Sequence, residues 1–174
     1  MRGIWAAAAL AVAWTGAARA EVADKSAAGF EVVETATIAA PAGKVWAALM
    51  RPSTWWDSRH TFTGAAKNLY IDPAGCFCEQ LPKGAVRHMT IVYADGRSLL
   101  RLAGALGPLQ ASGATGSLTF ALKPDGTATD LTLTYDVGGY ARGGLAQTWA
   151  APVDQVLGAQ LGRLKKAVET GKPD

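Results

Sequence analysis

Two histidines and two cysteines carry the most reactive side-chain atoms of this 174-residue sequence: His60, His88, Cys76 and Cys78. Thiolate sulfur and imidazole nitrogen are the donor atoms of a tetrahedral zinc site. A single residue separates the cysteines, however, which is closer than the usual spacing of a zinc knuckle. A regular hairpin turning at 81–84 also places His88 on the face away from both cysteines. We therefore predict neither a metal site nor a cofactor.

A disulfide is the other chemistry that Cys76 and Cys78 suggest, if the protein is exported. Strand residues two apart lie about 6.6 Å apart on one face, whereas a disulfide needs Cβ atoms about 3.5–4.5 Å apart. If Phe77 lies in a regular strand opposite His88, we expect the two thiols to remain unpaired. A disulfide in a bulged segment is the alternative, and a redox or metal site is the third possibility.

Glu34 places a carboxylate where an apolar side chain is expected. In the predicted strand at 30–38 it belongs to the inward set, between Val32 and Ala36. A carboxylate turned inward needs a partner or water. Two interpretations remain open, a polar group that orients a ligand in a cavity and a residue at the strand edge near an opening. Glu34 and His88 are the candidates for an acid or base, although we expect His88 to be a hydrogen-bonded strand residue.

The tandem Trp55-Trp56 offers aromatic surface for a ligand. If the pair is extended, the two indoles point in opposite directions, so we expect at most one of them to face the core. A cavity wall and a packing contact between short helices and a sheet both remain open. Trp149 lies four residues before Val153 on one helical face and is either a gate or a core residue. Further candidates for ligand contact are His60, Arg101, Tyr135, Tyr140 and Leu157.

Motifs of nucleotide-binding and hydrolytic enzymes are absent from the sequence. There is no nucleophile elbow, no zinc-protease helix motif, no glycine-rich dinucleotide turn after a strand and no P-loop. The glycine pairs at 138–139 and 143–144 predict a flexible loop rather than a phosphate cradle. Basic residues form no run that follows a phosphate backbone, so we predict no nucleic-acid partner.

Two predicted hairpins position these residues. Between Gly113 and Val137, apolar and polar residues alternate on both sides of a Lys-Pro-Asp-Gly turn, which predicts a hairpin with one dry face. Residues 86–93 and 98–106 form a similar pair around Asp95-Gly96. With the first strand, they predict an antiparallel meander without parallel crossovers, so the fold class is α+β.

A C-terminal helix supplies the second layer. Pro152 suits its first turn, with 145–151 as a separate turn before it. Gly171 suits a C-cap, and Gly158 and Gly162 each cost about 1 kcal/mol relative to alanine. A helix with one continuous apolar stripe must cover a dry sheet face. The stripe consists of Val153, Val156, Leu157, Leu161, Leu164 and Val168.

The segment at 38–64, IAAPAGKVWAALMRPSTWWDSRHTFTG, has the order strand, short helix, proline and tryptophan pair. With GCFCE, LGPLQ, TYDVGGY and VDQVLGAQLGRL, it resembles the START-like SRPBCC superfamily, in the branch of polyketide cyclase-like proteins and heat-shock chaperone ATPase activators. The resemblance covers residues 30–170. It implies a helix-grip fold of START/Bet v type: a curved antiparallel sheet of about six or seven strands around a long C-terminal helix. Short helices follow the first strand, and apolar molecules are held between sheet and helix.

The first 20 residues predict export. A basic start, an apolar run at 4–14 and the sequence Ala18-Arg19-Ala20 are typical of a signal peptide cut after Ala20. The run is shorter than the ~20 residues of a membrane span. Cleavage leaves 174 − 20 = 154 residues, with 17 − 2 = 15 basic groups against 14 acidic ones. We expect a signal peptide at 1–20, a loose leader at 21–28, a single domain at 29–171, a periplasmic or secreted location and no integral membrane segment after cleavage.

The function that these observations favour is binding of a small hydrophobic molecule, a lipid, an aromatic or a polyketide-like compound, in an internal cavity, without catalysis. A cyclase or hydrolase-like enzyme acting in the same cavity is the alternative, with Glu34, His88 or a tyrosine as acid or base. An interaction protein with a filled core is the third hypothesis. Export removes the protein from the nucleotide pool, which argues against an ATP-linked partner. A cavity between sheet and helix separates the first two hypotheses from the third.

Overall fold

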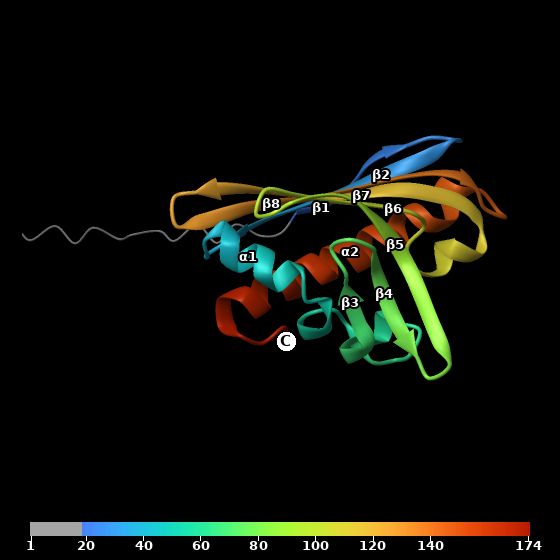
Figure 1. Cartoon of the computed structure of the whole chain (residues 1–174). Coiled ribbons are helices and arrows are strands. Elements are labelled where there is room, and N and C mark those ends of the chain that lie inside the picture. Colours follow the sequence, from blue (N-terminus) through green and yellow to red (C-terminus); the bar gives the residue numbers. More distant parts are fainter. Residues whose placement is uncertain (1–18) are drawn as a thin grey trace, which may run out of the picture.

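An eight-stranded antiparallel sheet curves over a long C-terminal helix in the computed structural model, which describes residues 19–174 (Figure 1). The strand order is β1-β2-β8-β7-β6-β5-β4-β3, so successive strands are neighbours except where β2 lies beside β8. This is the predicted α+β helix-grip arrangement, with eight strands where the sequence predicted fewer. No helix of the described residues is long and apolar enough to cross a bilayer.

The strands differ widely in length. They are β1 (Arg19–Lys25), β2 (Gly29–Ile38), β3 (Leu69–Ile71), β4 (Cys76–Leu81), β5 (Gly84–Asp95), β6 (Leu99–Ala103), β7 (Gly113–Asp125) and β8 (Ala128–Tyr140). The helices α1 (Ala42–Leu49) and α2 (Leu145–Thr170) lie on the same side of the sheet (Figure 1). Short 3₁₀ helices occupy the connections: η1 (Pro52–Thr54), η2 (Ser58–His60), η3 (Ala66–Asn68) and η4 (Gly107–Ala111).

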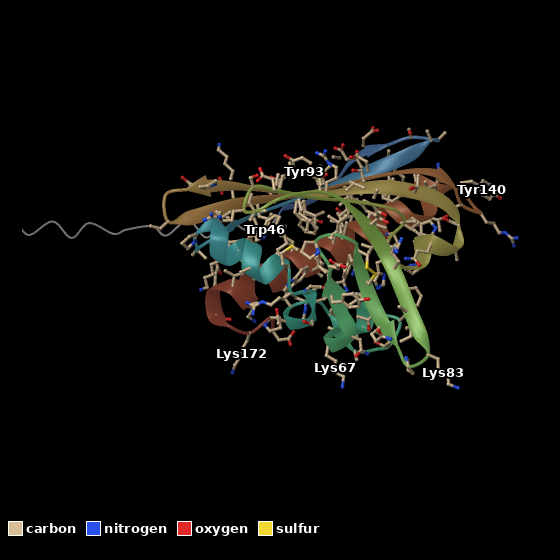
Figure 2. The ribbon with its side chains drawn as sticks, viewed as in Figure 1. Trp46, Lys67, Lys83, Tyr93, Tyr140 and Lys172 are labelled. Atoms are coloured by element: carbon tan, nitrogen blue, oxygen red, sulfur yellow. A yellow bond between two sulfur atoms is a disulfide. The ribbon has the colours of Figure 1, made fainter. Side chains whose placement is uncertain are left out.

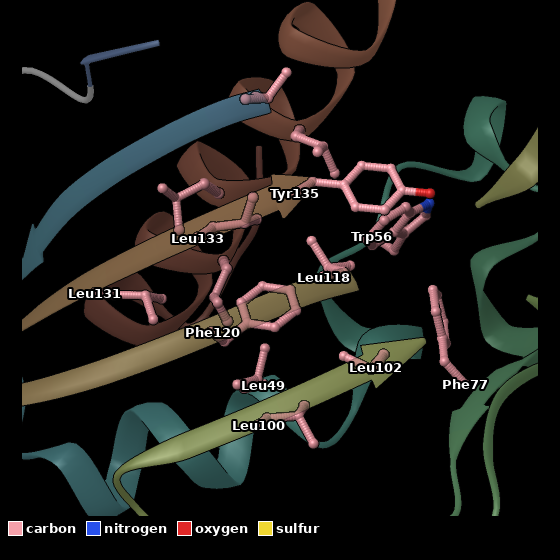
Figure 3. Close-up of a cluster of buried hydrophobic side chains, with 14 of the residues drawn as sticks. Leu49, Trp56, Phe77, Leu100, Leu102, Leu118, Phe120, Leu131, Leu133 and Tyr135 are labelled. Carbon is pink, nitrogen blue, oxygen red and sulfur yellow. The ribbon is translucent and has the colours of Figure 1, made fainter. Parts of the chain in front are cut away.

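The strands β7 and β8 form the predicted hairpin, and their apolar residues face the helices. Leu118 pairs with Tyr135 and Phe120 with Leu133, and none of these side chains is more than 5% exposed. Period-two alternation turns them all to one face of the sheet. Figure 3 shows them in one cluster with Leu49 of α1. Removing this apolar surface from water is what holds the helices on the sheet.

The N-terminal edge of the sheet contains a strand that the sequence did not predict. In β1, Glu21 lies opposite Val33 of β2 and Lys25 lies opposite Phe30. The expectation of a loose leader is therefore wrong for 21–25, because pairing with β2 gives these backbone groups hydrogen-bond partners. The predicted signal peptide lies outside the described residues, apart from its last two positions.

Helix α2 begins at Leu145 rather than at Pro152, so the separate turn expected at 145–151 is wrong. Proline inside a helix lacks the N–H that would bond the carbonyl four residues earlier. The helix nevertheless continues, because Leu145, Ala146 and Ala150 on the turns before the proline are buried, at 3% exposure or less. Burial of this first part of the helix offsets the lost hydrogen bond.

Cys76 and Cys78 are joined in a disulfide, which corrects the prediction that they remain unpaired. Their Cα atoms are 5.5 Å apart, which is within the range of separations that a disulfide joins. The prediction assumed a regular ladder between β4 and β5. The ladder is irregular here, since Phe77 pairs with Met89 whereas Cys78 pairs with Arg87. The bulged alternative is therefore the one that the structure contains.

Candidate ligand-binding site

A cavity of about 300 Å³ lies between the sheet, α2 and the loops that carry η2 and η4. Its wall is mainly apolar, and this volume is at the lower end of the range for small-molecule sites. Five of its lining residues are exposed and mark the opening to solvent: Arg59, His60, Phe62, Pro108 and Pro152. The inner wall consists of Trp56, Leu69, Phe77, His88, Leu106, Leu109, Tyr135, Trp149, Val153, Val156 and Leu157.

Trp56 forms part of this wall, and Trp55 packs beside it in the core. The side chains are 6% and 3% exposed, so the expectation that at most one of them faces the core is wrong. The pair is not extended, because it follows η1, where the backbone turns. Trp55 donates its indole N–H to the carbonyl of Ala48 at 2.9 Å, and Trp56 donates to that of His60 at 2.9 Å. Each buried indole N–H is therefore satisfied.

His88 reaches the cavity wall at a β-bulge in β5. A regular ladder would pair it with Phe77, as the sequence predicted. Phe77 pairs with Met89 instead, so His88 is the extra residue of the bulge, which corrects that register. As a result, the consecutive residues His88 and Met89 are both buried, at 5% and 1% exposure. In a regular strand they would face opposite sides of the sheet.

Glu79 lies behind His88 and is completely buried, at 0% exposure. Its Oε2 is 3.1 Å from Nε2 of His88. The backbone N–H groups of Phe62 and Thr63 donate to the same carboxyl group at 3.0 and 2.7 Å. Burial raises the pKa of Glu79, but hydrogen bonds from Thr63, Phe62 and His88 outweigh burial and hold that pKa below its ordinary value. Glu79 is therefore an ionised carboxylate, which only accepts hydrogen bonds.

The Glu79 carboxylate determines which nitrogen of His88 carries the hydrogen. Burial lowers the pKa of His88, and the hydrogen bond and charge of Glu79 offset only part of this effect, so the ring is neutral at pH 7. Nε2 carries the hydrogen and donates it to Glu79, which leaves Nδ1 as an acceptor. Nδ1 is buried and has no hydrogen-bond partner among residues 19–174. The rings of Phe62 and Phe77 flank that of His88, with centroids 5.7 and 5.0 Å away.

Tyr135 connects the cavity wall to the loop that carries η4. Its hydroxyl accepts a hydrogen bond from the N–H of Leu106 at 2.9 Å and donates to the carbonyl of Gly104 at 3.2 Å. Burial raises the pKa of Tyr135 to about 12, so the hydroxyl stays protonated. A Cβ on Gly116 of β7 would lie 2.7 Å from the Tyr135 ring, so only a glycine leaves room for it. Tyr135 therefore presents its ring, with a hydroxyl that is already engaged twice.

His60 stands at the opening and is held by α2. Nδ1 of His60 is 3.0 Å from Nε2 of Gln160. Gln160 is 1% exposed, and its Oε1 accepts the backbone N–H of Asp57 at 2.8 Å. Arg59 forms an ion pair with Asp57 at 2.6 Å, although its side chain is 84% exposed. One buried amide thus fixes the η2 loop relative to α2.

The structure brings six of the predicted residues to the cavity and leaves four outside its lining. Those in the lining are Trp56, His60, His88, Tyr135, Trp149 and Leu157, and those outside it are Glu34, Trp55, Arg101 and Tyr140. Arg101 lies on the exposed face of β6 and donates from Nε to Thr119 at 3.0 Å. Tyr140, at the end of β8, is 72% exposed and projects from the end of the molecule (Figure 2).

Glu34 faces inward, as predicted, but it lies under α2 instead of in the cavity wall. It is 0% exposed, and neither of its oxygens has a hydrogen-bond partner in the described part of the chain. A Cβ on Gly158 would lie 2.8 Å from Oε1 of Glu34, so the helix backbone passes close to the carboxyl group. Burial, and then the nearby carboxylate of Asp154, raise the pKa of Glu34 to about 7. Such an environment favours the protonated form of the carboxyl group.

Gln160 and Phe77 are site residues that sequence reasoning did not predict. Gln160 lies three residues after Leu157 and four before Leu164, so helical periodicity alone assigns it to the buried face. Phe77 lies two residues before Glu79, on the same face of a strand. Gln160 could therefore have been found from the sequence, because it is a polar residue within the apolar stripe of the helix.

The family of the chain is indicated by comparison with known proteins. A family model described as polyketide cyclase / dehydrase and lipid transport matches residues 29–169, which is most of the sequence. The match agrees with the resemblance stated from the sequence segments. No curated protein matches this sequence.

Solved structures resemble the chain at low sequence identity. A conserved protein of unknown function from Enterococcus faecalis matches with a TM-score of 0.57 and 16% identity, over 88% of this chain and 78% of that one. The Aha1 dimer from Colwellia psychrerythraea matches with a TM-score of 0.50 and 16% identity, over 82% and 98%. DynU16, a protein of the dynemicin biosynthetic locus, matches with a TM-score of 0.50 and 22% identity, over 82% and 48%. At these identities the likeness shows the fold alone.

Proposed function

The chain belongs to the polyketide cyclase / dehydrase and lipid transport family, and from that premise we propose that it binds a small hydrophobic molecule beneath α2, without chemistry of its own. The observation that carries this proposal is the cavity of about 300 Å³ with mainly apolar walls. Packed protein interiors contain few voids larger than a water molecule, whereas small-molecule sites have this size and this lining. An interaction protein with a filled core does not account for such a space.

Filling the cavity tests this proposal. Val156 lines the cavity, so Val156→Trp replaces part of the ligand space by an indole. We expect naphthalene to raise the melting temperature of the wild type, since a ligand that binds only the folded state stabilises it, and to have little effect on Val156→Trp. Ala159→Trp adds the same side chain on the exposed side of α2 and should retain the shift. Equal shifts in all three proteins, or none in any, would contradict the proposal.

Export is a second part of the proposal. The composition of residues 1–20 supports it, and so does the disulfide between Cys76 and Cys78, because disulfides persist in oxidising compartments. Cleavage after Ala20 would leave 21–25 of β1 to pair with β2. N-terminal sequencing of protein from its own host should then begin at Glu21, and an intact Met1 would contradict export.

Proton-transfer catalysis is a second candidate function, favoured by one observation. Nδ1 of His88 is an unengaged base on a ring that lines the cavity, with Glu79 behind it. Such a base takes a proton from a carbon beside a carbonyl and returns it, with no other reactant. In D₂O, 2-tetralone would then exchange its α-hydrogens faster with the wild type than with His88→Phe. Equal exchange rates by NMR would leave binding as the function.

A further inference from the structure

His88 is a polar residue on a cavity wall that is otherwise mainly apolar, and Glu79 lies behind it as its partner. The Glu79 carboxylate accepts hydrogen bonds from the backbone of Phe62 and Thr63 and from Nε2 of His88. The side chain of His88 is 4% exposed, and its buried Nδ1 meets no hydrogen-bonding group between residues 19 and 174. A buried acceptor without a donor costs free energy, and a ligand that donates to it recovers that cost.

We infer that the molecule bound in the cavity is an aromatic alcohol, whose hydroxyl donates its hydrogen to Nδ1 of His88 while its rings occupy the apolar space. This inference rests on the proposed function and names the class of ligand that the cavity selects. His88 is then the specificity-determining residue. Glu79 is a positioning residue, since it acts through the imidazole and not on the ligand.

The direction of this hydrogen bond follows from Glu79. If the hydrogen of the neutral imidazole were on Nδ1, the lone pair of Nε2 would face a carboxylate oxygen 3.1 Å away, which is repulsive. The carboxylate therefore fixes the tautomer, as it does for metal-bound histidines. A ring in this state accepts from a hydroxyl but opposes an ether or ketone oxygen. The neighbouring hydroxyl of Tyr135 is already engaged with Leu106 and Gly104.

The aromatic part of the inference follows from the walls. The ring planes of Phe62 and Phe77 are inclined by only 30° and 31° to that of His88. Trp56 meets Phe77 edge to face, at 61° and a centroid distance of 5.4 Å. Aromatic groups attract one another in such offset and edge-to-face arrangements. A flat ring system gains these contacts without the loss of rotamer freedom that a flexible acyl chain incurs on binding.

Three ligands of similar shape test the inference: naphthalene, 2-naphthol and 2-methoxynaphthalene. Isothermal titration calorimetry at pH 7.5 gives the Kd of each for the wild type, His88→Phe and Tyr140→Phe. We expect the wild type to bind 2-naphthol about tenfold more tightly than the other two, the size of effect that one buried hydrogen bond supports. The methyl ether keeps the oxygen and removes the donated hydrogen. In His88→Phe the three Kd values should converge, whereas the control Tyr140→Phe, whose side chain lies outside the cavity lining, should keep the preference.

Each outcome decides one of two questions. Binding of none of the three ligands would count against the proposed function itself. Equal Kd values in the wild type would overturn the inference while the proposed function stands. A preference that survives in His88→Phe would assign the hydroxyl to another group and also overturn it. If His88→Phe does not fold, the preference for the naphthol over its methyl ether in the wild type still decides the inference.

Discussion

Glu34 is a carboxyl group that strand alternation turns into the core, where the described residues offer it no donor. Leu133 of β8 lies beside it in the sheet, and Gly158 and Asp154 lie above it on α2. In such a place the neutral form is favoured, first by burial and then by the nearby carboxylate. The residue therefore links stability to pH without belonging to the ligand site.

Glu34→Gln should make the protein less sensitive to pH. In the wild type the pKa of Glu34 is raised from 4.5 to about 7, so the folded state holds a proton that the unfolded state has lost between these values. Stability contributed by this carboxyl group is present below pH 4.5 and is lost as the pH rises through 7. The variant should gain on the order of 1 kcal/mol relative to the wild type between pH 5 and 8.

Urea denaturation at several pH values measures that difference. Asp125→Asn, at the exposed end of β7, is the matched control and should follow the wild-type profile. A wild-type protein whose stability does not fall over this interval, relative to Glu34→Gln, would mean that Glu34 ionises normally in the folded state.

Some site residues could be predicted individually, and others could not, for physical reasons. Leu157 follows from the helical stripe, and Tyr135 follows from alternation along β8. The same rule excludes Arg101 from the cavity wall, because Leu100 and Leu102 on either side of it occupy the buried face of the sheet. Tyr140 follows Gly139, whose positive φ of 114° interrupts the alternation, so its direction was not readable from the strand.

At the scale of elements, the β-bulge in β5 decides what the site contains. Along β5, the even-numbered residues Val86 and His88 face inward first, and the odd-numbered residues Met89 and Ile91 face inward after them. The inward face therefore changes from even to odd positions between residues 88 and 89. A one-residue slip of this kind reverses the face of the residues that follow it, and the ladder with β6 shifts again between Ile91 and Tyr93. The parity change was visible in the sequence, but the turn at 82–83 alone predicts a regular register. The prediction of unpaired thiols in β4 failed for the same reason, because it also assumed a regular ladder.

Helix α2 shows how closely an element can approach the sheet when glycine is present. Gly158 faces the carboxyl group of Glu34, whereas a Cβ on Gly162 would meet no atom of the described residues within 4 Å. Both glycines were predicted to weaken the helix equally, since helix propensity depends on the residue and not on its neighbours. The structure distinguishes the two positions: Gly158 packs closely against the sheet, whereas Gly162 has open space around it.

Alanine substitution at the two glycines should therefore give different results. Gly162→Ala should stabilise the protein by about 1 kcal/mol, the full difference in helix propensity. Gly158→Ala gains the same propensity but places its methyl group 2.8 Å from Oε1 of Glu34, so it should give a smaller gain or a loss. Thermal denaturation monitored by circular dichroism compares the two. Equal gains would show that the carboxyl group moves aside freely.

At the scale of the whole molecule, the core has a filled part and a hollow part. Leu131, Leu133 and Phe120 pack with Leu49 of α1 in the filled part, and Trp56, Phe77 and Tyr135 gather at the other end of the cluster (Figure 3). The helix-grip class followed from hairpin alternation and the apolar stripe. The hollow part could not be predicted, because its walls consist of the same residue types as a filled core. Sheet curvature and loop contacts determine the space between them.

Two leucines of α2, Leu157 and Leu161, lie about one turn apart and distinguish the two parts. Each is 1% exposed, but Leu157 lines the cavity and Leu161 does not. Leu161→Ala should lower the free energy of unfolding by about 3–5 kcal/mol, as truncation in a packed core does. Leu157→Ala should cost about 1–2 kcal/mol less, because some of the removed atoms face space rather than neighbouring atoms. Urea denaturation of both variants, without ligand, measures the difference.

A ligand should bind in the hollow part of the core, so substitutions in the filled part should not change how much it stabilises the protein. Naphthalene at about 100 times its Kd should stabilise the wild type by about 2.7 kcal/mol. It should stabilise Leu161→Ala by a similar amount, since that substitution leaves the cavity wall unchanged. Its effect on Leu157→Ala should differ, because this variant changes both the volume and the contacts of the binding space. If both leucines cost the same and naphthalene stabilises all three proteins equally, the ligand does not bind beneath α2.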